Sequence, residues 1–291
     1  MRKQFIKTVE DILDTDELAV LLLGDIGVFG FRNSFKKYPD RVYNIGILEQ
    51  STIGTAAGLS KVGLIPFVHT IAPFIVERAL EQLKIDFGYQ NLNGNFISVG
   101  ASYDYTPLGP THHCPADIML LQSIPNMQIM IPGNSNELDL LIKSNYKNGC
   151  PTYYRISESK HTQKIEANLN GASVIKKGVK TTILCFGDML DSVLEATKDL
   201  DVTILYYTSV IPFDGVILNQ NFNEQIILIE QFYEGSVNYQ VNKALKGRKF
   251  SLFNIGIRHE FMDKNGTKKE MDKYLGLDPG SLGERISLCI K

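Results

Sequence analysis

Apolar and polar positions alternate along this chain with two different periods. Near the N-terminus the spacing is that of one helix face, with apolar residues at Phe5, Ile6, Val9, Ile12 and Leu13. From Ala19 onward, apolar runs of strand length alternate with segments of helix length. The expected strands are 19–23, 64–68, 95–99, 127–131 and 152–155, and the expected helices are 50–60, 73–87, 115–121 and 135–146. Strands separated by helices predict βαβ units on a parallel sheet.

A polar segment without clear periodicity, residues 157–173, interrupts this alternation. Behind it we expect a helix through Leu200, a second helix at 237–245, and strands at 181–187, 202–207, 226–230 and 250–257. The length of 291 residues is typical of about two domains. The sequence therefore predicts an α/β protein with two doubly wound, mainly parallel domains: residues 1–160, a linker at 161–172, and a smaller domain at 173–291.

Composition and charge exclude some classes of function. A net charge of -2 gives no basic field, so nucleic acid is not an expected partner. The apolar run at 19–23 is far shorter than the roughly 20 residues of a membrane span, and the first residues do not form a signal peptide. The widely spaced cysteines favour reduced thiols in a cytoplasmic protein: Cys114, Cys150, Cys185 and Cys289.

One carboxylate stands out at the start of an expected helix. Leu48, Glu49 and Gln50 follow a short extended segment and precede a run of small residues, which predicts close packing. Glu49 is either a helix N-terminal carboxylate favoured by the helix dipole or a partly desolvated group with a raised pKa. The second environment suits a carboxylate that shares a proton with a ligand nitrogen. Spacing alone leaves both interpretations open.

An aromatic residue follows the expected strand 64–68, at an edge where open parallel sheets bind ligands. Helical spacing places Phe74 near Arg78, Glu81 and Gln82. Phe74 is either a core residue or an aromatic platform for a flat heterocycle.

Paired histidines occupy a second such position. His112 and His113 lie in a loop marked by Gly109 and Pro110, just ahead of an expected helix. They are either polar loop residues or groups for substrate hydrogen bonding and proton transfer. Neither adjacent histidines nor the surrounding sequence favours a metal site. Glycine-rich dinucleotide motifs, Walker loops and nucleophile elbows do not occur.

Together these segments resemble the transketolase-type thiamine diphosphate enzymes, in particular the C-terminal subunit of split transketolases. The resemblance rests on blocks that occur in order, beginning with PDRVYNIGILEQSTIGTAAGLSKVGLIPFVHTIAPFIVERALEQLK (39–84). The later blocks are GPTHHCPADIMLLQSIPNMQIMIPGN (109–134), PTYYRIS (151–157), TTILCFGDMLDSVLEA (181–196), IILIEQFYEGSVNYQV (226–241) and 255–282. The resemblance implies a pyrimidine-binding domain followed by a transketolase C-terminal domain.

The resemblance also implies roles at the cofactor. The family glutamate that matches Glu49 bonds the aminopyrimidine of thiamine diphosphate and promotes its activation. Phe74 matches an aromatic that packs on the pyrimidine, whereas Ile71 stands where the family often has a second aromatic. Leu48 and Arg78 are expected to line the same pocket.

On the substrate side, the resemblance implies that His112 reaches substrate oxygens and that Arg155 holds a substrate phosphate. Asp25 and His113 are expected to lie on this side as well. Leu108 replaces the aspartate with which transketolases usually read a sugar hydroxyl, and the preceding loop looks shorter and lacks the family's upstream histidine. We therefore expect an altered sugar or a smaller 2-keto substrate.

The family motif that binds the diphosphate and Mg²⁺, Gly-Asp-Gly followed by a later Asn, has no match. The nearest strings are Gly24-Asp25-Ile26 and Gly187-Asp188-Met189. The resemblance thus implies an α-type partner chain that holds the diphosphate and Mg²⁺, in an α2β2 heterotetramer with two-fold symmetry. This chain is expected to supply no metal ligand and to be inactive alone.

The predicted function is two-carbon ketol transfer by the β-type subunit of a two-chain enzyme in carbohydrate metabolism. Two other enzymes stay open: the β subunit of a 2-oxo acid dehydrogenase E1 component, and a deoxyxylulose-phosphate-synthase-like subunit. The Gly-Pro-Thr-His-His string and Arg155 favour sugar phosphate chemistry over the first of these. A non-catalytic regulatory subunit is the alternative from another class.

Overall fold

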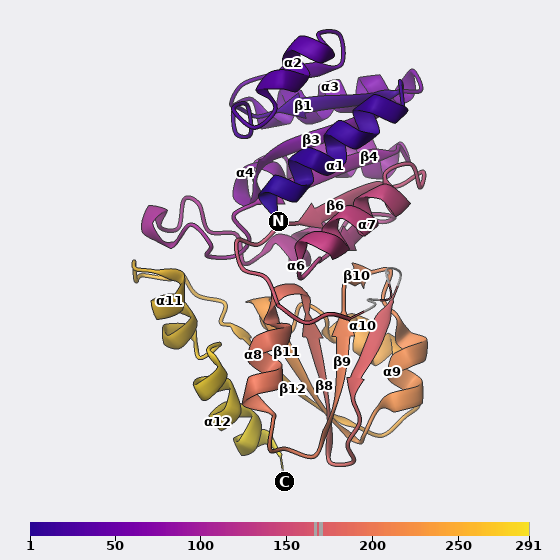
Figure 1. Ribbon diagram of the computed structural model, residues 1–291. Coiled ribbons are helices and arrows are strands. Elements are labelled where there is room, and N and C mark those ends of the chain that lie inside the picture. Colours follow the sequence, from indigo (N-terminus) through magenta and orange to yellow (C-terminus); the bar gives the residue numbers. More distant parts are fainter. Residues whose placement is uncertain (166–167, 169–170, 291) are drawn as a thin grey trace.

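The computed structural model describes residues 1–165, 168 and 171–290, which build two α/β units around separate sheets (Figure 1). The first sheet has the strand order β10-β5-β6-β4-β3-β1-β2, and every pairing in it is parallel except β10 with β5. Its strands are β1 (Ala19–Leu23), β2 (Val42–Asn44), β3 (Ile65–Ile71), β4 (Gly94–Val99), β5 (Gln128–Met130), β6 (Pro151–Arg155) and β10 (Ser209–Ile211).

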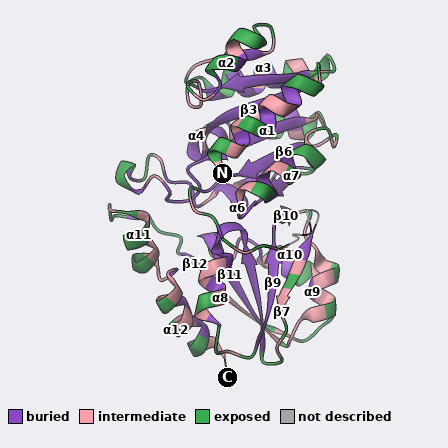
Figure 2. Ribbon diagram, viewed as in Figure 1, coloured by how far each residue is buried: buried purple, intermediate pink, exposed green. Residues whose placement is uncertain are grey.

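Alternating residues of the central strands supply two separate cores, because successive side chains point to opposite faces. In β1, Val20 and Leu22 join one cluster while Leu21 and Leu23 join the other. The first cluster is covered by α3 (Glu49–Lys61), α4 (Ala72–Val76) and α6 (Asp117–Leu121), and the second by α1 (Arg2–Thr15) and α7 (Ser135–Asn145). The sheet is thus buried on both faces, as the continuous apolar runs predict (Figure 2).

The second sheet has the order β12-β11-β8-β9-β7 and is parallel except for β7. Its strands are β7 (Ala172–Lys176), β8 (Thr181–Phe186), β9 (Val202–Tyr207), β11 (Gln225–Tyr233) and β12 (Ser251–Ile257). The helices of this unit are α8 (Leu190–Ala196), α9 (Gly215–Asn221), α10 (Asn238–Ala244), α11 (Lys268–Leu275) and α12 (Pro279–Cys289). None of the helices in the described ranges combines the length and apolarity that a membrane crossing requires.

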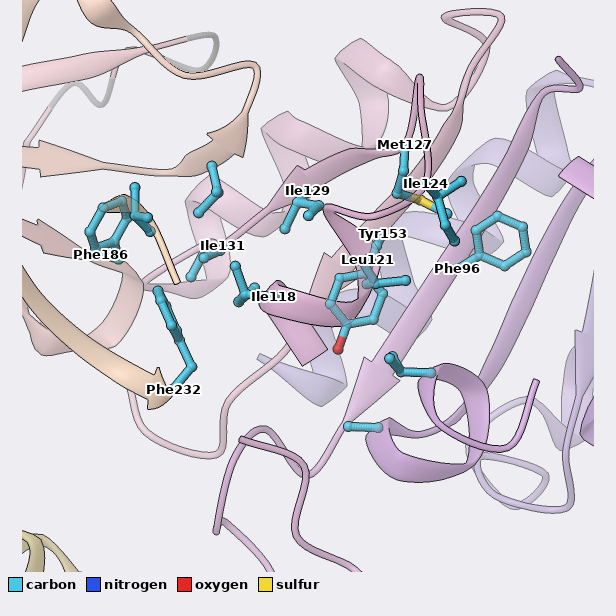
Figure 3. Packing of buried hydrophobic residues seen from close by; sticks show 14 of the residues in the cluster. Phe96, Ile118, Leu121, Ile124, Met127, Ile129, Ile131, Tyr153, Phe186 and Phe232 are labelled. Atoms are coloured by element: carbon cyan, nitrogen blue, oxygen red, sulfur yellow. The ribbon is translucent and has the colours of Figure 1, made fainter. Parts of the chain in front are cut away.

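The two units share one apolar cluster (Figure 3). Tyr153 and Ile129 of the first sheet continue through Ile131 to Phe186 and Phe232 of the second unit. In addition, β10 lies beyond the predicted linker and yet pairs with β5. The units therefore pack against each other through side chains and through one backbone ladder.

The predicted fold class is confirmed, whereas one long predicted helix is wrong. Segment 73–87 divides into α4, α5 (Leu80–Gln82) and a π-helical segment, Leu83–Tyr89. The break comes because the amide of Arg78 bonds five residues back, to the carbonyl of Pro73, and Ala79 leaves helical geometry. The apolar periodicity of the sequence continues across this break, so the pattern predicted one continuous helix.

Several elements were not predicted. These are β7, β10, α2 (Arg32–Lys37), α9, α11 and α12. Two had readable signals: α11 starts with a capping box formed by Thr267 and Glu270, and α12 starts with Asp278 as its N-cap and Pro279 behind it. Of the predicted linker, residues 166–167 and 169–170 lie outside the described residues.

Candidate active site

A narrow hollow lies where β1 and β3 end and α3 begins. Glu49 borders it together with Gly24, Thr52, Ile53, Val68, Thr70 and Ile75. A Cβ at Gly24 would stand 3.0 Å from the side chain of Thr70, so a larger residue at this position would force Thr70 to shift. The carboxyl edge of the parallel sheet therefore approaches the first turn of α3 closely, at the place where such sheets bind ligands.

Glu49 is the first residue of α3 and is only 3% exposed. Its Oε2 accepts a hydrogen bond of 2.7 Å from Nη1 of Arg78, while Oε1 is buried and has no hydrogen-bond partner in the described structure. Leaving a buried acceptor unpaired is costly, and such groups are rare in native proteins. The free oxygen of Glu49 thus marks a position that suits a ligand donor.

Phe74 connects Glu49 with the histidine loop. The guanidinium of Arg78 lies over the Phe74 ring at 4.2 Å from its centroid, a cation–π contact. On another side, the His112 ring meets Phe74 edge-on, with centroids 5.3 Å apart. Residues from three separate segments are therefore brought together: Glu49, Phe74, Arg78 and His112.

The loop before the histidine pair adds a residue that the sequence pattern did not reveal. Tyr105 is half-buried, and its ring lies 6.5 Å from that of His112. A Cβ at Gly100 would collide with Tyr105 and come within 3.3 Å of Ile71, so Ile71 and Tyr105 flank the same turn. The sequence did carry one signal for Tyr105, since it is an aromatic residue in a loop that follows a strand and is bounded by glycines.

His112 and His113 have different surroundings. Nδ1 of His112 lies 2.9 Å from Oγ1 of Thr111, and the ring is partly accessible. His113 is 4% exposed and lines a separate small cleft with Glu77, Tyr233 and Met262. Burial and the neighbouring charge of His112 lower the pKa of His113. His113 is therefore held largely neutral near neutral pH, facing the second unit.

Arg155 differs most from the sequence expectation. It is 2% exposed, and its Nε donates to Oδ2 of Asp117 over 2.7 Å. Its Nη2 donates to Oγ of Ser102 and to the carbonyl of Gln231. Since the guanidinium is enclosed by protein partners, the structure gives no support to a phosphate-binding role for Arg155.

The remaining expected residues lie at the rim. Leu48 and Leu108 are 57% and 55% exposed. Asp25, at the end of β1, is exposed, has a left-handed φ of 66°, and accepts a hydrogen bond from Nδ2 of Asn44 over 3.2 Å. Glu81 lies beyond the helix break, in α5. Among the described side chains, no group of three or more histidines, cysteines or carboxylates is placed to hold a metal ion.

This chain is an α/β protein with a buried carboxylate, an aromatic ring and a histidine at the carboxyl edge of a parallel sheet, which is the edge where open α/β sheets bind small ligands. Within that class, this chain belongs to the transketolase family: residues 1–163 match the family model described as "Transketolase, pyrimidine binding domain". The resemblance stated from the sequence is therefore confirmed, and the family implies the use of thiamine diphosphate.

Similar proteins support this assignment. A 33.6 kDa protein in the fasciation locus of Rhodococcoides fascians is 37% identical over 96% of this chain and 91% of that protein. One subunit of the apulose-4-phosphate transketolase of Actinobacillus succinogenes is 30% identical over 85% of this chain and 84% of that subunit. For 1-deoxy-D-xylulose-5-phosphate synthase of Pseudoalteromonas translucida, the identity is 32% over 83% of this chain, which spans only 40% of that enzyme.

Solved structures show the same fold. One described as "Split gene transketolase, inactive beta4 tetramer" has a TM-score of 0.86 and 24% identity, covering 99% of this chain and 97% of that one. Transketolase from Campylobacter jejuni has a TM-score of 0.83 and 17% identity, covering 99% of this chain and 46% of that one. This chain therefore corresponds in fold to about half of a full-length transketolase.

Proposed function

We propose that this chain is the β-type, pyrimidine-binding subunit of a two-chain, thiamine diphosphate-dependent enzyme that transfers a two-carbon ketol unit. The observation that carries the proposal is the buried, unpartnered Oε1 of Glu49 at the carboxyl edge of the sheet. An aminopyrimidine offers a flat ring and a ring nitrogen, and the site offers an aromatic surface and a carboxylate oxygen. The residues present thus fit the group.

The positions of the side chains around this site support a separate role for each of them. Glu49 shares a proton with a pyrimidine ring nitrogen, and its low exposure strengthens that hydrogen bond. Phe74 packs against the ring, with Leu48 and Ile71 at the margin. Arg78 fixes the orientation of the carboxylate, because it is the ion-pair partner of Oε2.

His112 is the residue suited to substrate oxygens. It is partly accessible, its ring is fixed by Phe74 and Tyr105, and its Nδ1 faces Thr111. One ring nitrogen is thereby oriented by the protein, which leaves the other for a substrate carbonyl or hydroxyl. Bound in this site, thiamine diphosphate would supply the electron sink for carbon–carbon bond cleavage beside a carbonyl.

The substrate is an altered sugar or a small 2-keto compound. Leu108 is exposed at the rim where transketolases usually carry an aspartate, so a sugar hydroxyl at that point would lose its acceptor. His113 and Asp25 remain candidates on the substrate side. A deoxyxylulose-phosphate-synthase-like reaction is the second candidate, because several of those synthases match this chain at 28% to 32% identity.

The diphosphate and Mg²⁺ belong to an α-type partner on this proposal, in an α2β2 heterotetramer. Its support is the similarity to one subunit of a transketolase, of which this chain covers 84%, and to a solved structure described as a split gene transketolase. The division into a pyrimidine-binding domain at 1–160, a linker at 161–172 and a C-terminal domain at 173–291 is retained as part of it.

The test co-expresses this chain with an α-type chain encoded nearby and measures thiamine diphosphate binding and ketol transfer. Glu49→Gln should lower turnover by at least about a hundredfold, since general acid–base groups contribute roughly 10² to 10⁴ in rate. Glu81→Gln, an exposed glutamate on α5, is the matched control and should keep full activity. Full activity of Glu49→Gln refutes the role of Glu49, and turnover by this chain alone refutes the two-chain arrangement.

A further inference from the structure

The second unit contains a cavity of about 240 Å³ that the proposed ketol transfer does not use. Its lining is Gly256, Arg258, Glu260, Lys273, Tyr274, Leu275, Gly276 and Arg285. We propose that this cavity binds the phosphate group of a small metabolite, or free phosphate, through Arg258, Lys273 and Arg285.

The cavity lies at the end of an edge strand. Arg258 follows directly after β12, Lys273 stands in the last turn of α11, and Arg285 projects from α12. Three separate elements therefore direct basic side chains at one space. The carboxyl end of a parallel strand is also where open α/β sheets bind ligands.

Arg285 is held in place by the end of α11. Its Nη1 donates to the carbonyls of Leu275 and Gly276 over 3.2 and 3.3 Å. Gly276 makes this approach possible, because a Cβ there would stand 3.3 Å from both Cδ and Nη1 of Arg285, and its φ is 67°. In the described part of the chain, Nε and Nη2 of Arg285 make no hydrogen bond. One edge of the guanidinium is thus anchored and the other is available.

The positive charge of the cavity is poorly balanced. Glu260 is the one carboxylate in its lining, against three cationic side chains. None of Arg258, Lys273 and Arg285 forms an ion pair within 4.0 Å with another described residue. Burial is the main cause that lowers the pKa of Arg285; Glu234 opposes this effect and the charge of Arg258 adds to it. A bound anion would supply a counter-charge for the three cationic side chains.

Size and chemistry select the ligand class. Pockets for drug-sized ligands measure about 300 to 1,000 Å³, so this cavity suits a smaller molecule. Guanidinium groups bind phosphate oxygens through paired N–H donors, and a lysine adds a point charge. Two arginines and a lysine together match the two negative charges of a phosphate better than the single charge of a carboxylate.

The test titrates the purified full chain by calorimetry with inorganic phosphate and, separately, with glycerol 3-phosphate, in a phosphate-free buffer of low ionic strength. We expect a Kd below about 1 mM for at least one probe, weakened by added salt. Tighter binding of glycerol 3-phosphate identifies a phosphorylated metabolite as the ligand, and equal binding identifies the phosphate group itself.

Arg258→Gln and Lys273→Gln should each weaken binding by about tenfold or more, since a hydrogen bond to a charged group is lost. Lys246→Gln, an exposed lysine elsewhere in the second unit, should bind as the unmodified chain does. Circular dichroism verifies that the variants fold. Binding of neither probe, or unchanged binding by the two cavity variants, overturns the proposal. Because no thiamine diphosphate is present, this result is independent of the proposed ketol transfer.

Discussion

The buried ion pair between Arg155 and Asp117 offers the sharpest test of how the two units are joined. Their side chains are 1% and 0% exposed, and Nε of Arg155 lies 2.7 Å from Oδ2 of Asp117. The same Oδ2 accepts a hydrogen bond from the Tyr153 hydroxyl over 3.1 Å. Because Arg155 also donates to the carbonyl of Gln231 in β11, the pair links the first sheet, α6 and the second sheet.

Replacing Asp117 by Asn would leave the guanidinium charged and enclosed without a counterion. An arginine guanidinium stays protonated in proteins, so Arg155 cannot escape this cost by losing its proton. Removing one partner of a buried pair costs about 3 to 5 kcal/mol. Asparagine keeps one acceptor for Nε of Arg155, so we expect the free energy of unfolding to fall by an amount near the lower limit of this range, about 3 kcal/mol.

This loss is large enough for a simple measurement. At about 2 to 4 °C per kcal/mol for a chain of roughly this size, Asp117→Asn should lower the melting temperature by about 6 to 12 °C. The double variant Asp117→Leu/Arg155→Met removes both charges and should recover much of that loss, since apolar replacements of buried pairs are often neutral or stabilising.

A surface pair provides the matched control. Lys198 and Glu195 have side chains that are 62% and 60% exposed, so Lys198→Ala should lower the melting temperature by about 2 °C at most. Thermal unfolding, followed by circular dichroism, measures the melting temperatures of all three variants. An Asp117→Asn variant as stable as Lys198→Ala, or a double variant less stable than Asp117→Asn, refutes the reasoning and reopens a ligand-binding role for Arg155.

Three further predictions concern the site and its surroundings. Phe74→Ala should raise the thiamine diphosphate concentration needed for half-maximal activity by more than about tenfold, whereas Phe74→Tyr should change it little; equal effects contradict a stacking role. Leu108→Asp should shift relative kcat/KM towards hydroxylated sugar substrates by about tenfold or more, and an unchanged substrate ratio contradicts this. Burial and the charge of Asp188 raise the pKa of Asp104 from 3.8 to about 7, so the folded chain holds a proton that the unfolded chain has lost, and stability falls as pH rises through this interval. In Asp104→Asn, the difference in melting temperature between about pH 5 and about pH 8 should therefore shrink; an unchanged difference contradicts the assignment.

Local sequence determined most of the first unit. Strand β1 has its predicted range, and β4, β6, α3 and α7 lie within one residue of theirs, while α1 contains the predicted apolar helix face. Their apolar runs are long and their period is clear, so few other structures could bury them. The sequence also sufficed to identify the family, because several motifs had to match in the same order along the chain.

Contacts between distant segments were outside the reach of the sequence. Arg155 matched a phosphate-binding position, but only the packed structure shows that Asp117 and Ser102 enclose it. Likewise, the pairing of β10 with β5 joins residues about 80 positions apart and left no local signal. Such features depend on which segments meet, and periodicity carries no information about partners.

Glu49 shows what the sequence determined and what required the tertiary structure. The sequence determined that a carboxylate begins a helix rich in small residues, and left both a dipole role and a ligand role open. The tertiary structure decided that one oxygen pairs with Arg78 while the other is buried without a partner. Burial is set by every element that packs around a side chain, so only the complete fold could distinguish a helix-end carboxylate from one that is placed for a ligand.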